Sequence, residues 1–357
     1  MDREGALSLL GRAPVVHLAS TTEGGEPLLR TLHGVIVASG GRPALAFHAA
    51  PVGEKTESVG RPAVVAAEEI VASVPSYFMD PERACPATTL YRSAQVHGVV
   101  ESVEDPARKA AVLAALMAKY QPEGGHVPIE AHHPLYEKAV AGIMVLQVPL
   151  ERVDGKAKLG QNRRPEERRL LLSRLWERGL PGDAAAVELV REANPDTPLP
   201  AFLVAPAAAA GVTLACAPGT LDVADVDAAA DLVAGAYWNE DTPRDALVRA
   251  HLGSPAWVGA RDADGRLVAT GRAVGDTAKR CWIYDVMVAP AWRGRGLGAA
   301  VVRLLLDHPA VRHARRVYLG TRDAQAFYAR LGFGDRGALE TARRTHPHHE
   351  MILIRPR

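Results

Sequence analysis

Cysteine is scarce in this chain, which also has neither long apolar runs nor an excess of one charge. Cys85, Cys216 and Cys281 lie far apart among 357 residues and form no CxxC pair. The sequence therefore predicts neither a disulfide framework nor a zinc site. No apolar run approaches the roughly 20 residues that cross a bilayer. We expect no membrane association and a reducing, cytoplasmic location.

Charge is balanced, since 42 Lys and Arg residues accompany 41 Asp and Glu residues and leave a net charge of +1. This balance gives no overall electrostatic footprint for nucleic acid. The opening residues, MDREGALSLLGRAPVVHLAS, are acidic at the start and carry an arginine inside their apolar stretch, unlike a signal peptide. Hydrophobic residues make up 48% and charged residues 23%, which is typical of globular proteins and excludes a disordered chain.

The length predicts two domains. Between residues 13 and 149, short apolar runs predict strands, and the turns EGGEP and SGGRP predict hairpins of a largely antiparallel sheet that closes or nearly closes. Helices are predicted over 105–122 and about 165–177, the second after the basic segment GKAKLGQNRRPEERR. We interpret this positive run as a solvated helix start; contact with nucleic acid phosphates is the alternative.

Residues 179–210 are rich in proline and alanine, which predicts a linker between domains at 1–178 and 211–357. Beyond the linker, predicted strands and helices alternate up to a last strand at 351–356. This pattern predicts an α/β sheet with helices inserted at regular intervals.

The most specific pattern is a glycine- and arginine-rich loop between an apolar strand and an apolar helix, in VMVAPAWRGRGLGAAVVRLLL. Glycines let the backbone approach a bulky anion, and the amides and dipole of the helix start complement pyrophosphate. The arginines add charge-assisted contacts. The predicted binding residues are Val286, Val288, Arg293, Gly294, Arg295, Gly296, Leu297 and Gly298.

A second segment, YLGTRDAQAFYARLGF, follows this loop. Together the two segments resemble the GNAT superfamily of N-acetyltransferases over roughly residues 211–356. The resemblance implies that Arg293, Gly296 and Gly298 hold the acetyl-CoA pyrophosphate and that Tyr328 protonates the departing CoA thiolate. It also implies that a small-molecule amine attacks the acetyl carbonyl.

Acidic residues near these segments are candidates for handling the amine. We predict that Asp285 removes the amine proton, directly or through water, or binds a cationic substrate; an outward-facing strand residue is the alternative. Asp323 lies with Thr321 at a strand-to-helix switch, and we predict that Asp323 caps the helix. Glu240 and Asp241 are further candidates for amine recognition.

The runs LLRTLHGVIV, ALAFHAAPVGEKTESV and LYRSAQVHGVVESVEDPARK resemble pyridoxamine 5'-phosphate oxidase-like split barrels, in particular the flavin-nucleotide-binding branch that includes nitroimidazole-resistance proteins. The resemblance covers roughly the first 175 residues. It implies an antiparallel split β-barrel with flanking helices, a homodimer, and flavin mononucleotide (FMN) held at its phosphate by basic residues. The matching flavin-site residues are Arg30, Thr31, His48, Lys55, Arg92 and Ser93.

Lys55 also has a case of its own, because a lysine in a glycine-containing turn after an apolar strand can meet a phosphate dianion; an ordinary solvated lysine is the alternative. Haem would need an axial histidine, but histidines spread one per strand are typical of surface or edge positions. These are His17, His33, His48 and His97. Further histidines have no acidic or cysteine partner at metal spacing, so we expect no metal site. They are His132, His133, His346, His348 and His349.

We interpret the chain as a fusion of an FMN-binding split barrel with a C-terminal α/β GNAT acetyltransferase. Two alternatives stay open. One is a flavin- or haem-dependent oxidoreductase whose GNAT half only recognises a ligand. The other is a regulatory protein whose barrel senses a cofactor and whose basic segment contacts DNA.

Overall fold

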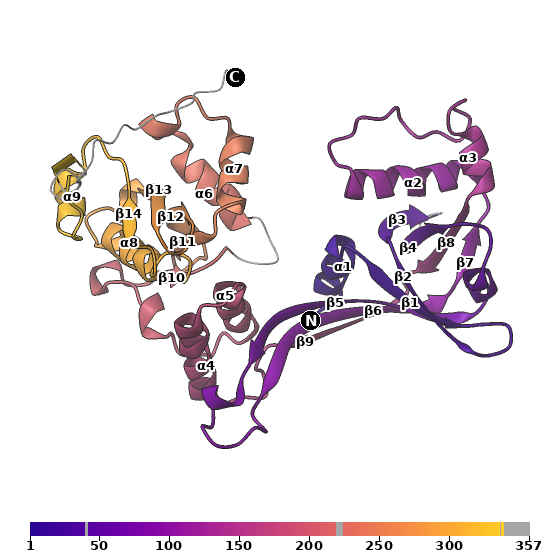
Figure 1. Ribbon diagram of the computed structural model, residues 1–357, viewed down its shortest axis with the longest axis horizontal. Coiled ribbons are helices and arrows are strands. Elements are labelled where there is room, and N and C mark those ends of the chain that lie inside the picture. Colours follow the sequence, from indigo (N-terminus) through magenta and orange to yellow (C-terminus); the bar gives the residue numbers. More distant parts are fainter. Residues whose placement is uncertain (40–41, 219–223, 336, 339–357) are drawn as a thin grey trace. The chain divides into compact units, whose positions relative to one another are not determined.

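The computed structural model describes residues 1–39, 42–218, 224–335 and 337–338 (Figure 1). The chain divides into two compact units, one comprising Met1–Pro200 and the other Ala201–Pro218 with the chain from Ala224 onward. Among the described residues, no helix is both long and apolar enough to traverse a lipid bilayer.

The first unit contains two antiparallel sheets. One has the strand order β2-β1-β5-β6-β9 and the other the order β3-β4-β8-β7. Their bounds are β1 Val16–Thr21, β2 Pro27–Leu32, β3 Val35–Ser39, β4 Arg42–Ala49, β5 Pro62–Val74, β6 Thr88–Val99, β7 Glu101–Val103, β8 Met144–Pro149 and β9 Arg152–Lys158. Leu18 and Val65 of the first sheet share one buried core with Phe47 and Leu146 of the second. The expected antiparallel split barrel is confirmed.

Five helices flank these sheets: α1 Arg3–Arg12, α2 Pro106–Tyr120, α3 Glu137–Gly142, α4 Pro165–Arg178 and α5 Asp183–Ala193. Helix α1 was not predicted from the sequence. The Asp2 carboxylate accepts a hydrogen bond from the Gly5 amide at 2.9 Å and so caps the helix start. Leu9 and Leu10 of α1 are buried in the barrel core.

Helix α5 lies within the predicted linker. The Arg178 guanidinium at the end of α4 donates to the Asp183 carboxylate at 2.9 Å, which joins the two helices. Because Asp183 is buried and Arg178 is largely so, this pair belongs to a packed interior. Residues 179–200 therefore form part of the first unit, and the division between the units falls at Pro200.

The second unit is built on a five-stranded sheet with the order β10-β11-β12-β13-β14. The elements are β10 Thr213–Ala215, α6 Ala224–Ala234, the short 3-10 helix η5 Tyr237–Asn239, α7 Arg244–Leu252, β11 Ala256–Arg261, β12 Leu267–Gly275, β13 Arg280–Val288, α8 Leu297–Asp307, β14 Arg316–Tyr318 and α9 Gln325–Ala329. They follow the predicted alternation of strands and helices. The strand predicted at 351–356 lies outside the described residues.

Helices lie against both faces of this sheet. A side chain at Gly271 of β12 would meet Val301 and Leu305 of α8 at 3.0 Å. The next residue, Arg272, donates to the Ser254 hydroxyl just beyond α7 at 3.2 Å. Since neighbouring residues of a strand face opposite ways, α8 covers one face and the α7 end covers the other.

Strands β13 and β14 part soon after they meet. They pair in parallel only from Arg280↔Arg316 to Trp282↔Tyr318. From Ile283 to Val288, β13 remains paired with β12 but has no strand partner on its other side within the described part of the chain. This separation opens the sheet at the end of β13.

Candidate active site

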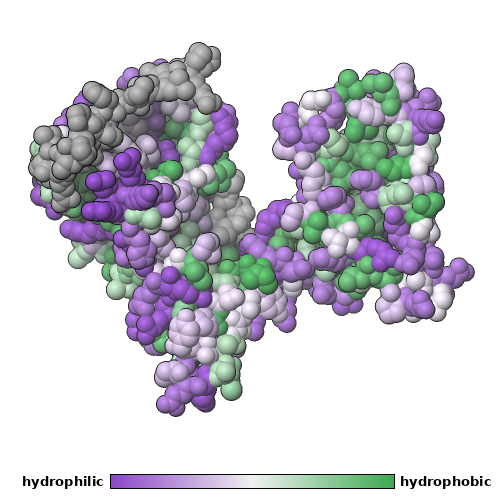
Figure 2. All heavy atoms as spheres, in the orientation of Figure 1, coloured by the Kyte–Doolittle hydropathy of each residue, from purple (hydrophilic) through white to green (hydrophobic). Residues whose placement is uncertain are grey.

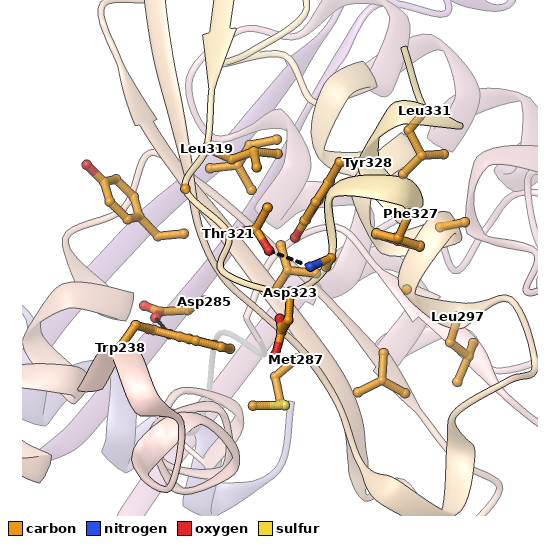
Figure 3. Close-up of a pocket in the computed structure, with 18 of the residues that line it drawn as sticks. Trp238, Asp285, Met287, Leu297, Leu319, Thr321, Asp323, Phe327, Tyr328 and Leu331 are labelled. Atoms are coloured by element: carbon orange, nitrogen blue, oxygen red, sulfur yellow. Dashed lines mark hydrogen bonds between the residues drawn. The ribbon is translucent and has the colours of Figure 1, made fainter. Parts of the chain in front are cut away.

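A cavity of about 1320 Å³ lies where β13 and β14 part. Its walls are the second half of β13, the start of α8, the loop 319–324, α9 and η5. Figure 3 shows side chains from these elements pointing toward a common space, among them Trp238, Met287 and Tyr328. The predicted acetyl-CoA residues therefore come together with Tyr328 and Asp285, with one exception described below.

The backbone of β13 offers hydrogen-bond donors to this cavity. The Ala289 amide donates to the Val268 carbonyl of the β12 side at 2.8 Å. Because successive amides of a strand point to opposite sides, those of Val286 and Val288 point away from β12, toward the cavity. Both residues were predicted to bind the cofactor, and both line the cavity.

A β-bulge shapes this part of β13. The pairing with β12 shifts register between Thr270 and Arg272, so that Gly271 faces both Asp285 and Val286. Asp285 has a positive φ of 54°, which is uncommon outside glycine. Bulges of this kind redirect a strand and are frequent next to active sites.

The glycine-rich loop has the conformation that its sequence predicted. Gly294 and Gly296 have φ angles of 75° and 81°, which favour glycine. Helix α8 then begins at Leu297, and its first helical bond runs from the Ala300 amide to the Gly296 carbonyl at 3.1 Å. The preceding amides at the helix start lack helical acceptors and can donate to an anion, supported by the helix dipole.

The two arginines predicted to bind CoA, Arg293 and Arg295, have different surroundings. Arg293 lines the cavity and donates from Nε to the Val288 carbonyl at 3.1 Å. Arg295 instead stacks over the Trp292 ring, 4.7 Å from its centroid, and is absent from the cavity wall. Four further cavity-lining arginines were missed, because nothing near them in the sequence marks them as binding residues: Arg272, Arg303, Arg322 and Arg330.

Tyr328 on α9 lines the cavity, and Figure 3 shows its hydroxyl end pointing toward Thr321. Burial raises the pKa of Tyr328 above the ordinary value for tyrosine, and nearby Tyr237 raises it further. The phenol therefore keeps its proton at neutral pH. A protonated phenol that lines a binding cavity can donate that proton to a leaving group.

Asp285 is almost completely buried and is held by three neighbours. One oxygen accepts from the Arg272 Nε at 2.5 Å, and the other accepts from the Trp238 Nε1 at 2.9 Å and the Asn239 Nδ2 at 3.3 Å. Burial by itself would raise the pKa of Asp285, but the Arg272 charge and these hydrogen bonds outweigh it and lower the pKa. Asp285 is thus a fixed carboxylate, and sequence reasoning missed all three partners.

His251 of α7 lies close to this group and is buried. Both of its ring nitrogens lack a hydrogen-bond partner within the described structure. Burial lowers the pKa of His251 to about 4, while the charges of Asp285 and Arg272 act on it in opposite directions. The imidazole is therefore neutral near pH 7 and adds no charge beneath the cavity.

The expected helix cap at Asp323 is wrong. Helix α9 begins at Gln325 without a side-chain cap. The Thr321 Oγ1 accepts the Ala324 amide at 3.0 Å and takes the place that the Asp323 carboxylate was expected to fill. Asp323 lines the cavity instead. Glu240 and Asp241 are exposed and form no part of the cavity wall.

The predicted flavin residues do not all come together within one chain. Arg30 on β2 forms an ion pair with Glu54 of the short 3-10 helix η1, Glu54–Ser58, which also carries Lys55. Thr31 follows Arg30 on β2, and its hydroxyl lies 3.2 Å from His17 Nδ1.

Arg92 and Ser93 lie on β6, which β1 and β5 separate from β2. With strands spaced about 4.8 Å apart, the two positions are at least roughly 14 Å from Arg30. The Arg92 guanidinium is buried and donates to the Glu69 carboxylate at 2.7 Å. Glu69 also accepts from Arg12 of α1 at 2.9 Å.

The histidines have individual environments. His48 on β4 lines a small open pocket of about 340 Å³ with Lys138. Burial and, secondarily, the nearby His33 lower the pKa of His48. His17 pairs with Glu68 at 3.3 Å and His97 with Asp154 at 3.2 Å. Residues His346, His348 and His349 lie outside the described residues.

Three of the six basic residues in the segment 155–169, which runs into the first turn of α4, form ion pairs with acidic residues. Arg164 pairs with Glu167 and Arg169 with Glu166, each at 2.8 Å. Arg168 is buried and pairs with Asp196 at 2.5 Å. These ion pairs offset half of the positive charge that could have contacted phosphates.

Comparison with known proteins agrees with this division. Residues 2–157 match the pyridoxamine 5'-phosphate oxidase family model, and residues 226–333 match the acetyltransferase (GNAT) family model. A glucosamine 6-phosphate N-acetyltransferase of Oryza sativa subsp. japonica is 40% identical over 78 residues. That match covers 20% of this chain and 47% of the rice enzyme, so the chain spans about half the length of this relative.

Solved structures give matches to each half. A protein of Xanthomonas campestris pv. campestris assigned to the GNAT family is 30% identical with a TM-score of 0.32, covering 38% of this chain and 93% of that one. A Bacteroides thetaiotaomicron protein assigned to 5-nitroimidazole antibiotic resistance is 21% identical with a TM-score of 0.35, covering 44% and 84%. By its two family matches, the chain joins a pyridoxamine 5'-phosphate oxidase-like domain to a domain of the acetyltransferase (GNAT) family.

Proposed function

We propose that the C-terminal domain transfers the acetyl group of acetyl-CoA to a primary amine. The observation that carries this proposal is that one cavity contains both the free amides of a helix start and the half-buried phenol of Tyr328, whose pKa is raised. The free amides of α8 and Arg293 suit the CoA pyrophosphate. The amides of Val286 and Val288 suit carbonyl oxygens of the bound thioester.

The reaction follows from these positions. After the acceptor has lost one proton, its nitrogen forms a bond to the acetyl carbonyl carbon. The carbon–sulfur bond then breaks, and the Tyr328 phenol gives its proton to the CoA thiolate. The nitrogen loses its second proton to solvent, from which Tyr328 regains its own. The products are an N-acetylated amine and free CoA.

Release of free thiol from acetyl-CoA in the presence of primary amines tests this function. Because a glucosamine 6-phosphate N-acetyltransferase is similar over part of the domain, the amines tested include a phosphorylated amino sugar beside unphosphorylated alkyl and aryl amines. Amine-dependent thiol release is the expected result. Tight binding of CoA without turnover on any amine would favour the alternative in which this domain only recognises a ligand.

The glycine loop allows a controlled test of where CoA binds. Replacing Gly296 by valine places a β-branched residue at a φ of 81°, which costs roughly 1 to 2 kcal/mol of folding stability, and it also obstructs the anion site. Gly265 has the same φ of 81° in open space between β11 and β12. We expect both variants to lose similar stability in thermal unfolding, while calorimetry detects weakened CoA binding only for Gly296→Val.

Equal CoA affinity in the two folded variants would contradict the placement of the pyrophosphate at this loop.

We propose for the N-terminal domain that it binds FMN with Lys55 and Arg30 near the phosphate. The support is that Arg30 contacts η1, the helix that carries Lys55, so two cations gather at one end of the barrel. The fit is partial, because Glu54 and Glu57 lie on the same short helix and Arg92 is engaged by Glu69.

Titration of FMN fluorescence with micromolar protein tests flavin binding. Loss of one charge-assisted phosphate contact weakens binding roughly 10-fold or more, so we expect Lys55→Ala to quench less than wild type. Lys279→Ala, in the other unit, serves as the control. Equal quenching by the two variants would place the phosphate elsewhere, and no quenching by wild-type protein would leave the domain without FMN.

A homodimer through the barrel is a further proposal, which follows from the family resemblance. Large apolar side chains of the first unit remain exposed, including Leu29 at 63% and Ile70 at 65%, and Figure 2 shows hydrophobic residues on the visible surface of this unit. Native mass spectrometry measures the oligomeric state and any bound flavin, haem or CoA together.

A further inference from the structure

Two carboxylates line the acetyltransferase cavity, and they differ in how they are engaged. The Asp285 side chain is 3% exposed, and both of its oxygens already accept hydrogen bonds from Arg272, Trp238 and Asn239. An incoming ammonium group would have to displace these donors. Asp285 is therefore poorly suited to bind a substrate cation.

Asp323 is free to bind one. Its side chain is 68% exposed, and among the described residues its one charged neighbour is Arg322, 3.9 Å away. The Arg322 guanidinium instead stacks over the Tyr237 ring, 3.8 Å from its centroid. The Asp323 carboxylate thus remains without a close partner.

The loop that carries Asp323 is nevertheless held in place. The Tyr237 hydroxyl accepts the Arg322 amide at 2.9 Å, and Thr321 accepts the Ala324 amide at 3.0 Å. These two bonds fix the backbone on both sides of Asp323. Figure 3 shows its carboxylate pointing toward Met287, across the cavity from the buried Asp285.

The surroundings of this carboxylate suit an organic ammonium ion. Aromatic rings line the same cavity, and Trp238 and Tyr284, on the side of Asp285, each remain 42% exposed. Aromatic faces attract cations and pack against apolar bodies. A carboxylate on one side of such a cavity can bind the ammonium group while the rings on the other side receive the carbon skeleton.

We propose that Asp323 binds the ammonium group of the acceptor, and that the acceptor is a primary amine on an apolar or aromatic skeleton. The proposal rests on the acetyltransferase function proposed above. Under this proposal, Asp323 recognises the substrate cation, and Asp285 holds the bulge of β13 in place.

The test compares two probes of the same shape, 2-phenylethylamine and the uncharged 2-phenylethanol, titrated into CoA-saturated full-length protein and followed by tryptophan fluorescence. Asp323→Asn removes the charge and keeps the shape. Asp264→Asn is the matched control, because Asp264 is similarly exposed at 69%, has a neighbouring arginine partner, and lies outside the cavity wall. Affinity for CoA is measured for each protein in the absence of probe.

We expect wild type to bind the amine more tightly than the alcohol, and Asp323→Asn to lose roughly 10-fold of amine affinity with alcohol and CoA affinities unchanged. Asp264→Asn should match wild type. Equal binding of amine and alcohol by wild type, or an unchanged amine affinity in Asp323→Asn, would overturn the assignment. Failure of acetyl transfer is a separate outcome, because it appears as absent thiol release while the amine still binds.

Discussion

Replacing Tyr328 by phenylalanine should lower kcat by about 10²-fold, with little change in the KM for acetyl-CoA, because a positioned proton donor typically contributes at least that factor. The ring contacts of Tyr328 with Phe327 and Phe333 remain available to phenylalanine, so the variant should fold. The change isolates the hydroxyl, whose raised pKa keeps it protonated at neutral pH.

Tyr284→Phe provides the control for Tyr328, because Tyr284 lines the same cavity and also loses one phenol oxygen. Steady-state thiol release, measured for both variants with one accepted amine, should separate them. If Tyr328→Phe keeps its turnover within a few-fold of wild type, Tyr328 is a packing residue and water protonates the thiolate.

Replacing Asp285 by asparagine should have the largest effect on stability. It leaves the Arg272 guanidinium, whose side chain is 14% exposed, without its counter-ion, and breaking a buried ion pair costs about 3 to 5 kcal/mol. Thermal or denaturant unfolding measures this loss. Activity should fall too, because Asp285 sits at the β13 bulge and its carboxylate ties the bulge to Trp238, Asn239 and Arg272.

The pH profile of kcat/KM distinguishes this positioning role from the general base predicted at first. If Asp285 positions the bulge, Asp285→Asn lowers kcat/KM by a similar factor at every pH and keeps the acidic limb of the profile. Trp238→Phe should act in the same direction, since it removes one donor to the same carboxylate. Loss of the acidic limb in Asp285→Asn alone would restore Asp285 as the base.

The lowered pKa of Asp285 also determines how its contribution to folding stability changes with pH. A carboxyl whose folded pKa lies below its unfolded value stabilises the protein above the unfolded value, near 3.8, and this stabilisation is lost as the pH falls through the folded pKa. The wild-type protein should therefore lose this contribution only in strong acid, and the stability difference from Asp285→Asn should shrink there.

The sequence predicted those parts of the site whose signals are local. The glycine loop and the start of α8 are contiguous, and each glycine is required by its own backbone angle or by close approach, so residues 293–298 could be recognised as a unit. Tyr328 was found in the same way, from the short segment around it. The alternation of apolar runs likewise located most strands, since each depends on its own residues.

The parts that escaped prediction depend on contacts between distant elements. Asp285 receives its donors from η5 and from β12, and nothing in the YDVMV run indicates that its carboxylate is already occupied. Arg92 was expected to meet a phosphate, but Glu69 from β5 neutralises it together with Arg12 from α1. Helix α1 itself is short, and the barrel core stabilises it by burying Leu9 and Leu10.

The two amides that β13 turns toward the cavity have a consequence for mutational tolerance. In the proposed site, the ligand accepts hydrogen bonds from the main-chain amides of Val286 and Val288, so its binding depends on the direction of the strand and not on the identity of these side chains. Exchanges among valine, isoleucine and leucine should be nearly silent at Val288. Proline is different, because it has no N–H. It would remove the main-chain amide donor, which every other substitution keeps.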